Sequence, residues 1–333
     1  MIYNNVELHN IDAVAEGEHG VIMLRVPEET RQQLNVRARD VVVPYTTGVE
    51  IRFVMNGDKA IVKLYIEGSD PYAYLPLQLY YGGVASGWVW FDPMNLNVGL
   101  NEIVINKPKG LEKLVAKSES EGHAFDCSVI RLLLPSTKMQ FVGVEGDVRP
   151  PETNEKPQKR IVFYGSSITH GSLSCLTSNT FVNILGSEMN AEVFNKGFPG
   201  SCHVSHAMSD YVASRGDCDY AVCEVATNVY KTIPDSELVE RIEYLIKTYK
   251  TANPDKPLVI IDNLIVSERT EPSRRLVRKA IRNAGLDNVL YINGKKLLTT
   301  NKYVMADFTH PTPMGQFTIA MNLLKILKSK GLA

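Results

Sequence analysis

A serine, an aspartate and a histidine in this sequence have the types and the order that nucleophilic catalysis requires. Ser167 follows a glycine and a serine at the end of an apolar run, and Asp307 and His310 form an Asp-x-x-His near the C-terminus. A serine hydroxyl is a weak nucleophile, so it needs a base, which is usually a histidine oriented by a carboxylate. Taken singly, such a serine is as often a helix N-cap, and a lone loop histidine is more often solvated.

Two further segments could donate hydrogen bonds to the negative oxygen that develops when an ester is attacked. Residues 195–200, Asn-Lys-Gly-Phe-Pro-Gly, contain glycines whose backbone N–H groups could approach a substrate closely. Residues 226–228, Ala-Thr-Asn, place the amide of Asn228 after another apolar run. Glycine-rich loops and loop asparagines are common, so each segment alone is a weak indication.

Together, these segments resemble the four signature blocks of the SGNH hydrolases, the GDSL-type serine esterases. Residues 165–169, Gly-Ser-Ser-Ile-Thr, resemble the Gly-Asp-Ser block, with Ser167 at the nucleophile position. Residues 195–200 and 226–228 resemble the second and third blocks, and residues 307–310 resemble the terminal Asp-x-x-His. The four blocks occur in the family's order within residues 159–333, so the combination is much more specific than any single block.

The resemblance implies a set of site residues and a mechanism. Ser167, Asp307 and His310 would be the catalytic residues, and the oxyanion hole would be formed by the N–H groups of Ser167 and Gly200 with the side chain of Asn228. The family's chemistry is ester hydrolysis through an acyl-enzyme. It requires neither a metal ion nor another cofactor, so we expect none.

Two residues depart from the family's usual pattern. Ser166 replaces the aspartate before the nucleophile, and Ala226 replaces the glycine of the third block. Neither position carries the proton transfer. We therefore interpret both as marks of a subgroup, with a consequence for the shape of the oxyanion hole.

Several other side chains allow either a functional or a structural interpretation. His170 could line the substrate pocket or lie on a helix surface, and the sequence favours neither. His203 and His206 have helical spacing, but no carboxylate or cysteine accompanies them at a fitting distance, so no metal site is expected. Trp88 and Trp90 share one face of an expected strand, where core packing is favoured over a platform for a sugar.

The chain divides into two parts joined by a linker. Residues 1–148 contain short alternating or β-branched runs separated by turn residues, which is typical of a β-sandwich or jelly roll. Residues 149–158 are rich in proline and charge, as interdomain linkers are. Residues 159–333 alternate apolar runs with helical patterns, which predicts an α/β domain with a doubly wound parallel sheet. The resemblance adds that this domain has three layers and is flavodoxin-like.

Individual elements follow from the same patterns. The runs expected as strands in the first part lie at 49–55, 61–66, 73–81, 87–91, 101–105, 127–134 and 139–144. In the second part, Asp235 is expected as the N-cap of a helix, and Thr312 and Pro313 are expected to start the last one. The apolar face of that last helix is expected to contain Phe317, Met321, Leu324 and Leu327.

Composition excludes some classes of partner. The formal net charge is −1, with 44% apolar and 22% charged residues, so neither nucleic acid nor a membrane surface is expected as a partner. No apolar run is long enough to span a bilayer, and no signal peptide is visible, so the protein is expected to be cytoplasmic, or exported with its leader removed. The five cysteines include no Cys-x-x-Cys pair, which argues against a disulfide framework or a zinc knuckle. The oligomeric state is not indicated.

The expected function is that of a serine esterase for a small acyl group, such as acetyl, on a carbohydrate-like alcohol. The carbohydrate part rests on architecture, because a β-sandwich before such a domain resembles a bacterial branch of carbohydrate-directed esterases. Two alternatives stay open. One is a catalytically inactive carbohydrate-binding protein, and the other is a lipase or thioesterase, which would need an apolar acyl channel.

Overall fold

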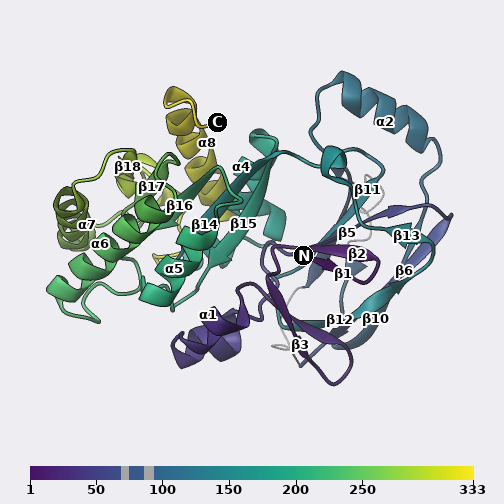
Figure 1. The fold of residues 1–333 in the computed structure, drawn as a ribbon, viewed down its shortest axis with the longest axis horizontal. Helices are drawn as coiled ribbons and strands as arrows, with labels where there is room; N and C mark the ends of the chain where they lie inside the picture. Colours follow the sequence, from purple (N-terminus) through teal and green to yellow (C-terminus); the bar gives the residue numbers. More distant parts are fainter. Residues whose placement is uncertain (69–74, 86–93) are drawn as a thin grey trace.

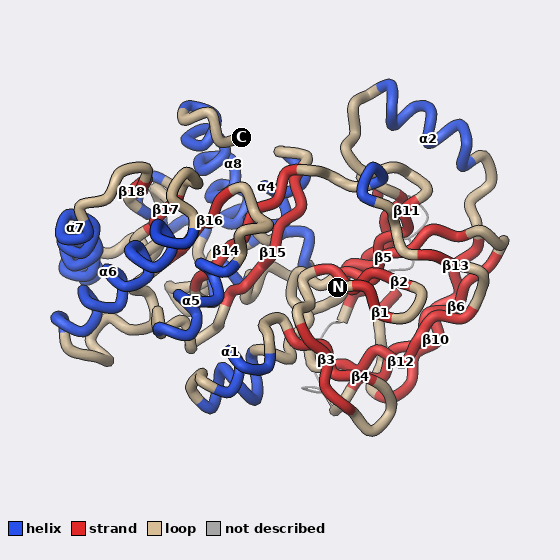
Figure 2. The backbone as a smooth tube through the Cα atoms, viewed as in Figure 1, coloured by secondary structure: helices blue, strands red, loops and turns tan. Residues whose placement is uncertain are grey.

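The computed structural model describes residues 1–68, 75–85 and 94–333, so the expected strand at 87–91 and both tryptophans lie outside the described residues. Figures 1 and 2 show a strand-rich N-terminal part beside a C-terminal part in which helices surround a sheet. Within the described ranges, no helix combines the length and the apolar character needed to cross a membrane.

Antiparallel sheets form the N-terminal part. One sheet has the order β1-β2-β5-β11-β7-β8, with β13 beside β5 and β9 beside β7, and another has the order β10-β6-β12-β4-β3. Apolar residues of both sheets, such as Ile51 and Val62, share one buried cluster, so the predicted sandwich is confirmed. The strands are β1 Ile2–Tyr3, β2 Val6–His9, β3 Ala13–Glu16, β4 Val21–Leu24, β5 Glu50–Met55, β6 Lys59–Ile66, β7 Pro76–Tyr81, β8 Val84–Ala85, β9 Met94–Asn95, β10 Gly99–Asn106, β11 Val129–Leu133, β12 Met139–Glu145 and β13 Val148–Arg149.

Several elements of the N-terminal part were not predicted. They include the strands before residue 25 and three helical segments: α1 (Glu28–Gln32), η1 (Ala38–Val42) and α2 (Leu111–Ser120). The segment that contains α1 and η1 leaves the sandwich and lies against α5, as Figure 1 shows. Its apolar residues join the core of the C-terminal part.

A parallel sheet forms the centre of the C-terminal part, in the order β15-β14-β16-β17-β18. Its strands are β14 Lys159–Gly165, β15 Ala191–Gly197, β16 Tyr220–Glu224, β17 Leu258–Ile261 and β18 Val289–Ile292. The α-helices around it are α3 Ser167–His170, α4 Phe181–Glu188, α5 His206–Ser214, α6 Asp235–Ala252, α7 Glu271–Ala284 and α8 Pro313–Ser329.

Residues of β14 alternate between the two faces of this sheet. Val162 and Tyr164 belong to a core that also contains residues of α5, α6 and α7, whereas Ile161 and Phe163 belong to a core formed with α4 and α8. Burial on both faces explains why this strand reads as a continuous apolar run. The predicted doubly wound, three-layer arrangement is confirmed (Figure 1).

The start of the last helix agrees with its prediction, and its apolar face agrees in part, since Leu324 and Leu327 are buried. The side chain of Thr312 accepts a hydrogen bond from the N–H of Gly315, and Pro313 is the first helical residue. Phe317 is exposed, because the buried face is shifted toward residues such as Ile319 and Leu323. Asp235 is likewise not an N-cap but the first residue of α6, after Pro234.

The segment expected to be a linker is folded against its surroundings. Strand β13 pairs with β5, and the guanidinium of Arg149 binds the carboxylate of Glu155 at 2.6 Å. Glu152 and Glu155 form a capping box around a short helical turn. The division at residues 149–158 stays a prediction.

Arg25 joins the N-terminal part to the end of β15. Its side chain is fully buried and donates to the carbonyl groups of Tyr45, Val42, Asn195 and Gly197, at 2.7, 2.8, 2.9 and 3.1 Å. Burial lowers the pKa of Arg25 to about 10, so the group stays charged at neutral pH. A buried cation without these partners would be strongly unfavourable. The two parts must therefore pack so that carbonyl groups of both reach this guanidinium.

Lys196 makes a second buried connection in the same place. Its ammonium group donates to the carbonyls of Asn10 and Arg25 and pairs with the carboxylate of Asp12 at 2.8 Å. Burial lowers the pKa of Lys196 to about 8. The end of β15 is thus fixed by groups from the N-terminal strands.

Two histidines are buried between the parts. The Nε2–H of His9 donates to the carbonyl of Val193 at 2.8 Å, and burial lowers its pKa to about 3. Burial also lowers the pKa of His170 to about 3. Both imidazoles are therefore neutral at physiological pH.

We expect Arg25→Met to lower the free energy of unfolding by about 3 kcal/mol or more, since it strands buried carbonyl groups without a donor. Chemical denaturation of the purified variant measures this loss. Arg39→Met is the matched control, because Arg39 is partly exposed and pairs with the adjacent Asp40, and it should leave stability close to that of the wild type. Equal losses in both variants would contradict the structural role of Arg25.

Stability should fall as the pH falls from about 6.5 toward 3. Unfolded histidines take up a proton near pH 6.5, whereas His9 and His170 in the folded protein do so only near pH 3, so acid favours the unfolded state. Each histidine contributes a slope of about 1.4 kcal/mol per pH unit within this window.

The slope is measured by denaturation between about pH 6 and 5, where most carboxylates stay ionised. His170→Gln should reduce it, whereas His206→Gln, which changes an exposed histidine, should not. An unchanged slope in His170→Gln would show that His170 does not resist protonation.

Candidate active site

Ser167 stands at the turn between β14 and α3. The strand ends at Gly165, and Ser166 is the N-cap, since its hydroxyl accepts the N–H of Ile168 at 3.2 Å. The N-cap interpretation thus holds for Ser166 and leaves the hydroxyl of Ser167 available. Ser167 is the first helical residue, only 6% exposed, at the carboxyl end of a central strand, where open α/β sheets bind ligands.

The structure brings Ser167, His310 and Asp307 into one hydrogen-bonded chain. His310 Nε2 lies 2.8 Å from Ser167 Oγ, and His310 Nδ1 lies 2.5 Å from Asp307 Oδ2. With a proton on Nδ1, the ring donates to the carboxylate and accepts from the serine hydroxyl. This is the tautomer that a general base for the serine needs.

The loop before α8 holds Asp307 in position. Its Oδ1 accepts the backbone N–H groups of Thr309 and His310, both at 3.0 Å. The intervening Phe308 has a φ of 57° and is 81% exposed. Hydrogen bonds from His310, above all from its ring, lower the pKa of Asp307 to about 2, so the carboxylate is ionised at neutral pH.

The other two predicted residues are Gly200 and Asn228, and Asn228 binds the segment that follows Gly200. Gly200 has a φ of 63°, a left-handed conformation that glycine adopts without strain. Two residues later, the N–H of Cys202 donates to Asn228 Oδ1 at 3.2 Å. Because the amide oxygen is occupied in this way, the Nδ2 donors of Asn228 face away from that bond.

Both departures from the family's pattern have local explanations. Ser166 is fully buried and supplies the cap of α3. Ala226 has a φ of 75°, a region that costs a residue with a Cβ roughly 1 kcal/mol or more, which accounts for the glycine that the family usually has there.

Glu224 is a residue of this site to which the sequence assigned no role. Its buried carboxylate accepts the N–H of Ser166 at 2.6 Å and the hydroxyls of Thr169 and Thr227. Burial raises the pKa of Glu224. It connects the nucleophile turn with the third block. The signal in the sequence was a carboxylate directly after the apolar run of β16.

His170 is buried beside the nucleophile, so it does not lie on a helix surface. Its Nδ1 lies 3.2 Å from the carbonyl of Gly197, and its Nε2 lies 2.7 and 2.8 Å from the hydroxyls of Thr47 and Ser136. A Cβ on Gly197 would lie 2.2 Å from the backbone nitrogen of His170, so only glycine fits there. His170 borders a cavity but is bound through both ring nitrogens.

That cavity, of about 630 Å³, lies next to the hydrogen-bonded residues Ser167, His310 and Asp307. We name it the hydroxyl-lined cavity. It borders Ser172, whose N–H binds the carbonyl of Ser167, and Pro199, which precedes Gly200. It also borders Met305, whose N–H binds the carbonyl of His310. Side chains with hydroxyl groups make up much of its lining: Tyr45, Thr47, Ser136, Ser172, Ser174, Thr177 and Thr180.

The other candidate residues are not brought into this site. His206 binds Glu240 on the protein surface, and His203 lies near the amide of Asn35, so the two histidines do not form a pair. Cys175 is exposed at the rim of the hydroxyl-lined cavity, whereas Cys127, Cys202, Cys218 and Cys223 are buried.

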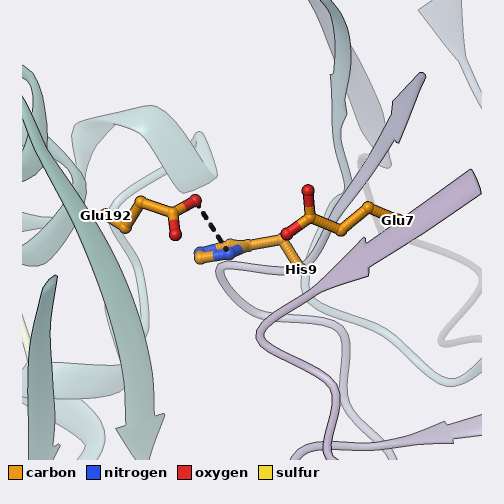
Figure 3. A group of neighbouring side chains, drawn as sticks. All are labelled: Glu7, His9 and Glu192. Carbon is orange, nitrogen blue, oxygen red and sulfur yellow. Dashed lines mark ion pairs between the residues drawn. The ribbon is translucent and has the colours of Figure 1, made fainter. Parts of the chain in front are cut away.

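A different cluster, of Glu7, His9 and Glu192, has the spacing of metal ligands (Figure 3). Its carboxylates already bind cations of the protein. Arg52 contacts Glu192 and lies 3.8 Å from Glu7, and Lys156 lies 2.9 Å from Glu7. Since His9 also uses Nε2 to bind a carbonyl, the cluster fits a buried ion-pair network between the two parts better than a metal site.

Comparison of the whole fold finds solved structures that share both parts. The salicylyl-acyltransferase SsfX3 from a tetracycline biosynthetic pathway has a TM-score of 0.79 at 15% identity, over 99% of this chain and 96% of that chain. A family two carbohydrate esterase from Clostridium thermocellum, in complex with cellohexaose, has a TM-score of 0.61 at 15% identity, over 86% and 93%. An acetyl xylan esterase from the rumen bacterium Butyrivibrio proteoclasticus has a TM-score of 0.60 at 12% identity, over 99% and 97%.

Comparison of the sequence identifies the family. No curated protein matches the chain significantly. The model of the GDSL-like Lipase/Acylhydrolase family matches residues 158–328, just over half of the chain, and this range contains all four blocks. The chain therefore belongs to the GDSL-like lipase/acylhydrolase family and is a carboxylic ester hydrolase.

Proposed function

We propose that the protein is a serine esterase that removes a small acyl group, such as acetyl, from a carbohydrate-like alcohol. The observation that carries this proposal is the chain from Asp307 through His310 to Ser167, with heavy-atom distances of 2.5 and 2.8 Å. Those distances are within hydrogen-bond reach for proton transfer.

In the proposed mechanism, Ser167 Oγ attacks the ester carbonyl while His310 Nε2 takes its proton. Asp307 stabilises the imidazolium that forms, and the same proton then passes to the departing alcohol. Water next attacks the acyl-enzyme, with His310 again as base, and releases the acid and the free serine. Transfer to another alcohol would use the same acyl-enzyme, so the choice of acceptor depends on what binds beside it.

The oxyanion would be held by the N–H groups of Ser167 and Gly200 and the Nδ2 of Asn228. The contact between Asn228 Oδ1 and the N–H of Cys202 supports this orientation of the amide. Glu224 would hold the turn of Ser167 and the third block in register. Preorganised donors of this kind are typically worth about 100- to 1000-fold in turnover each.

The hydroxyl-lined cavity supports a polar alcohol as the leaving group. Its lining combines hydroxyl groups with apolar side chains such as Leu173 and Leu176, and a sugar, which presents both hydroxyl groups and C–H faces, matches this mixed surface. The fold shared with two carbohydrate esterases is consistent with this preference. A short acyl group also fits, because the nucleophile is almost completely buried.

Hydrolysis of 4-nitrophenyl acetate, butyrate and octanoate tests the proposal. We expect the wild type to cleave the acetate best, and Ser167→Ala to lose at least about 1000-fold in kcat. Ser214→Ala, which changes an exposed serine of α5, is the matched control and should keep full activity. Release of acetate from acetylated glucose and xylose then tests the alcohol.

Three results would redirect the proposal. Preference for octanoate would indicate a lipase. If the wild type and Ser167→Ala both fail to hydrolyse every ester, but the protein binds glycans measurably, a carbohydrate-binding protein would be indicated. Equal activity in both proteins would exclude Ser167 as the nucleophile.

A second prediction concerns Asp307. Asp307→Asn keeps the shape of the side chain but removes the charge that stabilises the imidazolium, so kcat should fall by about 1000- to 10,000-fold with little change in KM. Asp235→Asn, at the exposed start of α6, removes the same charge elsewhere and should have no effect. A small loss in Asp307→Asn, with the fold verified by circular dichroism, would show that His310 does not depend on the carboxylate.

A further inference from the structure

Arg37 reaches the oxyanion-hole loop from the other part of the chain. It immediately precedes η1, in the segment that crosses from the sandwich to the C-terminal part. Its Nε lies 3.4 Å from the carbonyl oxygen of Pro199, and it would lie 3.4 Å from a Cβ placed on Gly200. The guanidinium therefore lies directly over the turn that we assign to the oxyanion.

Arg37 differs from the neighbouring arginines, Arg31 and Arg39, in its lack of a carboxylate partner among the described residues. Arg31 pairs with Glu28 at 2.8 Å, and Arg39 pairs with Asp40 at 2.8 Å. Over residues 1–68, 75–85 and 94–333, no carboxylate lies within ion-pair distance of Arg37. An exposed guanidinium held this way keeps most of its donors for a ligand.

The same guanidinium borders the hydroxyl-lined cavity. Among the described residues of its lining, Arg37 has the one charged side chain, since His170 is kept neutral by a pKa of about 3. No aspartate or glutamate lies among those described lining residues. A concave site with one sign of charge attracts ligands of the opposite sign.

We propose that the substrate carries a carboxylate close to its scissile ester and that Arg37 binds this carboxylate. A guanidinium can bind a carboxylate through two parallel N–H···O bonds, which fixes orientation as well as charge. The carboxylate belongs either to the alcohol, as in an acylated uronic acid, or to the acyl group, as in a succinyl ester. The inference rests on the proposed esterase function and names the substrate class for that site.

The test compares acidic and neutral esters that otherwise match. In the alcohol arm, an O-acetylated methyl glucuronide is compared with the corresponding O-acetylated methyl glucoside. In the acyl arm, 4-nitrophenyl hydrogen succinate is compared with 4-nitrophenyl butyrate. We expect the wild type to favour the acidic member of one arm by about tenfold or more in kcat/KM, and that arm identifies the source of the carboxylate.

Variants at Arg37 then test whether this side chain causes the preference for acidic esters. Arg37→Gln should abolish it by raising KM for the acidic ester, and Arg37→Lys should keep part of it, because an ammonium retains the charge without the planar fork. Arg39→Gln, which removes a neighbouring arginine already paired with Asp40, should keep the full preference. Added salt should weaken the preference in the wild type.

Two results would overturn the inference. One is a wild type that favours the neutral ester in both arms. The other is an Arg37→Gln variant in which kcat falls equally for acidic and neutral esters, since that would place Arg37 at the oxyanion.

A binding measurement separates this inference from the proposed function. Ser167→Ala is titrated with methyl glucuronide, methyl glucoside, succinate and butyramide by calorimetry, with and without Arg37→Gln. Tighter binding of an acidic compound that Arg37→Gln removes supports the anion site even if no ester is hydrolysed. Equal binding of acidic and neutral compounds excludes it even if the esterase is active.

Discussion

The guanidinium of Arg25 is the cation around which the two parts of this protein meet. It is removed from solvent, and its partners are carbonyl groups of both parts, among them those of Asn195 and Gly197. Asn195 in turn donates to the carbonyl of Thr169, two residues after Ser167 in α3. The position of the nucleophile helix and of the oxyanion loop therefore depends on an arginine that lies about 140 residues earlier in the chain.

The N-terminal part is accordingly more than an accessory placed next to an enzyme. Polar residues of β2 and β5 face the C-terminal part, where Arg52 contacts Glu192 and His9 binds the carbonyl of Val193. The same part supplies Thr47 and Ser136 to His170 and brings Arg37 over Gly200. The hydroxyl-lined cavity thus has walls from both parts, so substrate selection and folding are coupled through one interface.

The sequence predicted many features that are determined locally, although it misplaced the N-cap of α6. The apolar runs identified the parallel strands because strands buried on both faces are continuous in hydrophobicity, and Thr312-Pro313 identified the start of α8. The order of the blocks placed Ser167, Asp307 and His310, which the structure brings together. Long-range polar contacts could not be predicted. The run at 49–55 alternates apolar and polar residues, yet the polar Glu50 and Arg52 are also buried, because another part of the chain covers them. Nothing near Arg37 in the sequence indicates that it reaches residues 199 and 200.

The most direct test of the account is to trap the acyl-enzyme. The wild type is mixed with excess 4-nitrophenyl acetate, quenched in acid within the first turnovers, and its intact mass is measured, followed by peptide mapping. The account predicts a fraction of the protein heavier by one acetyl group, located on Ser167 and absent from Ser167→Ala. A burst of nitrophenol with the acetyl group on another residue, or the same adduct in Ser167→Ala, would contradict it.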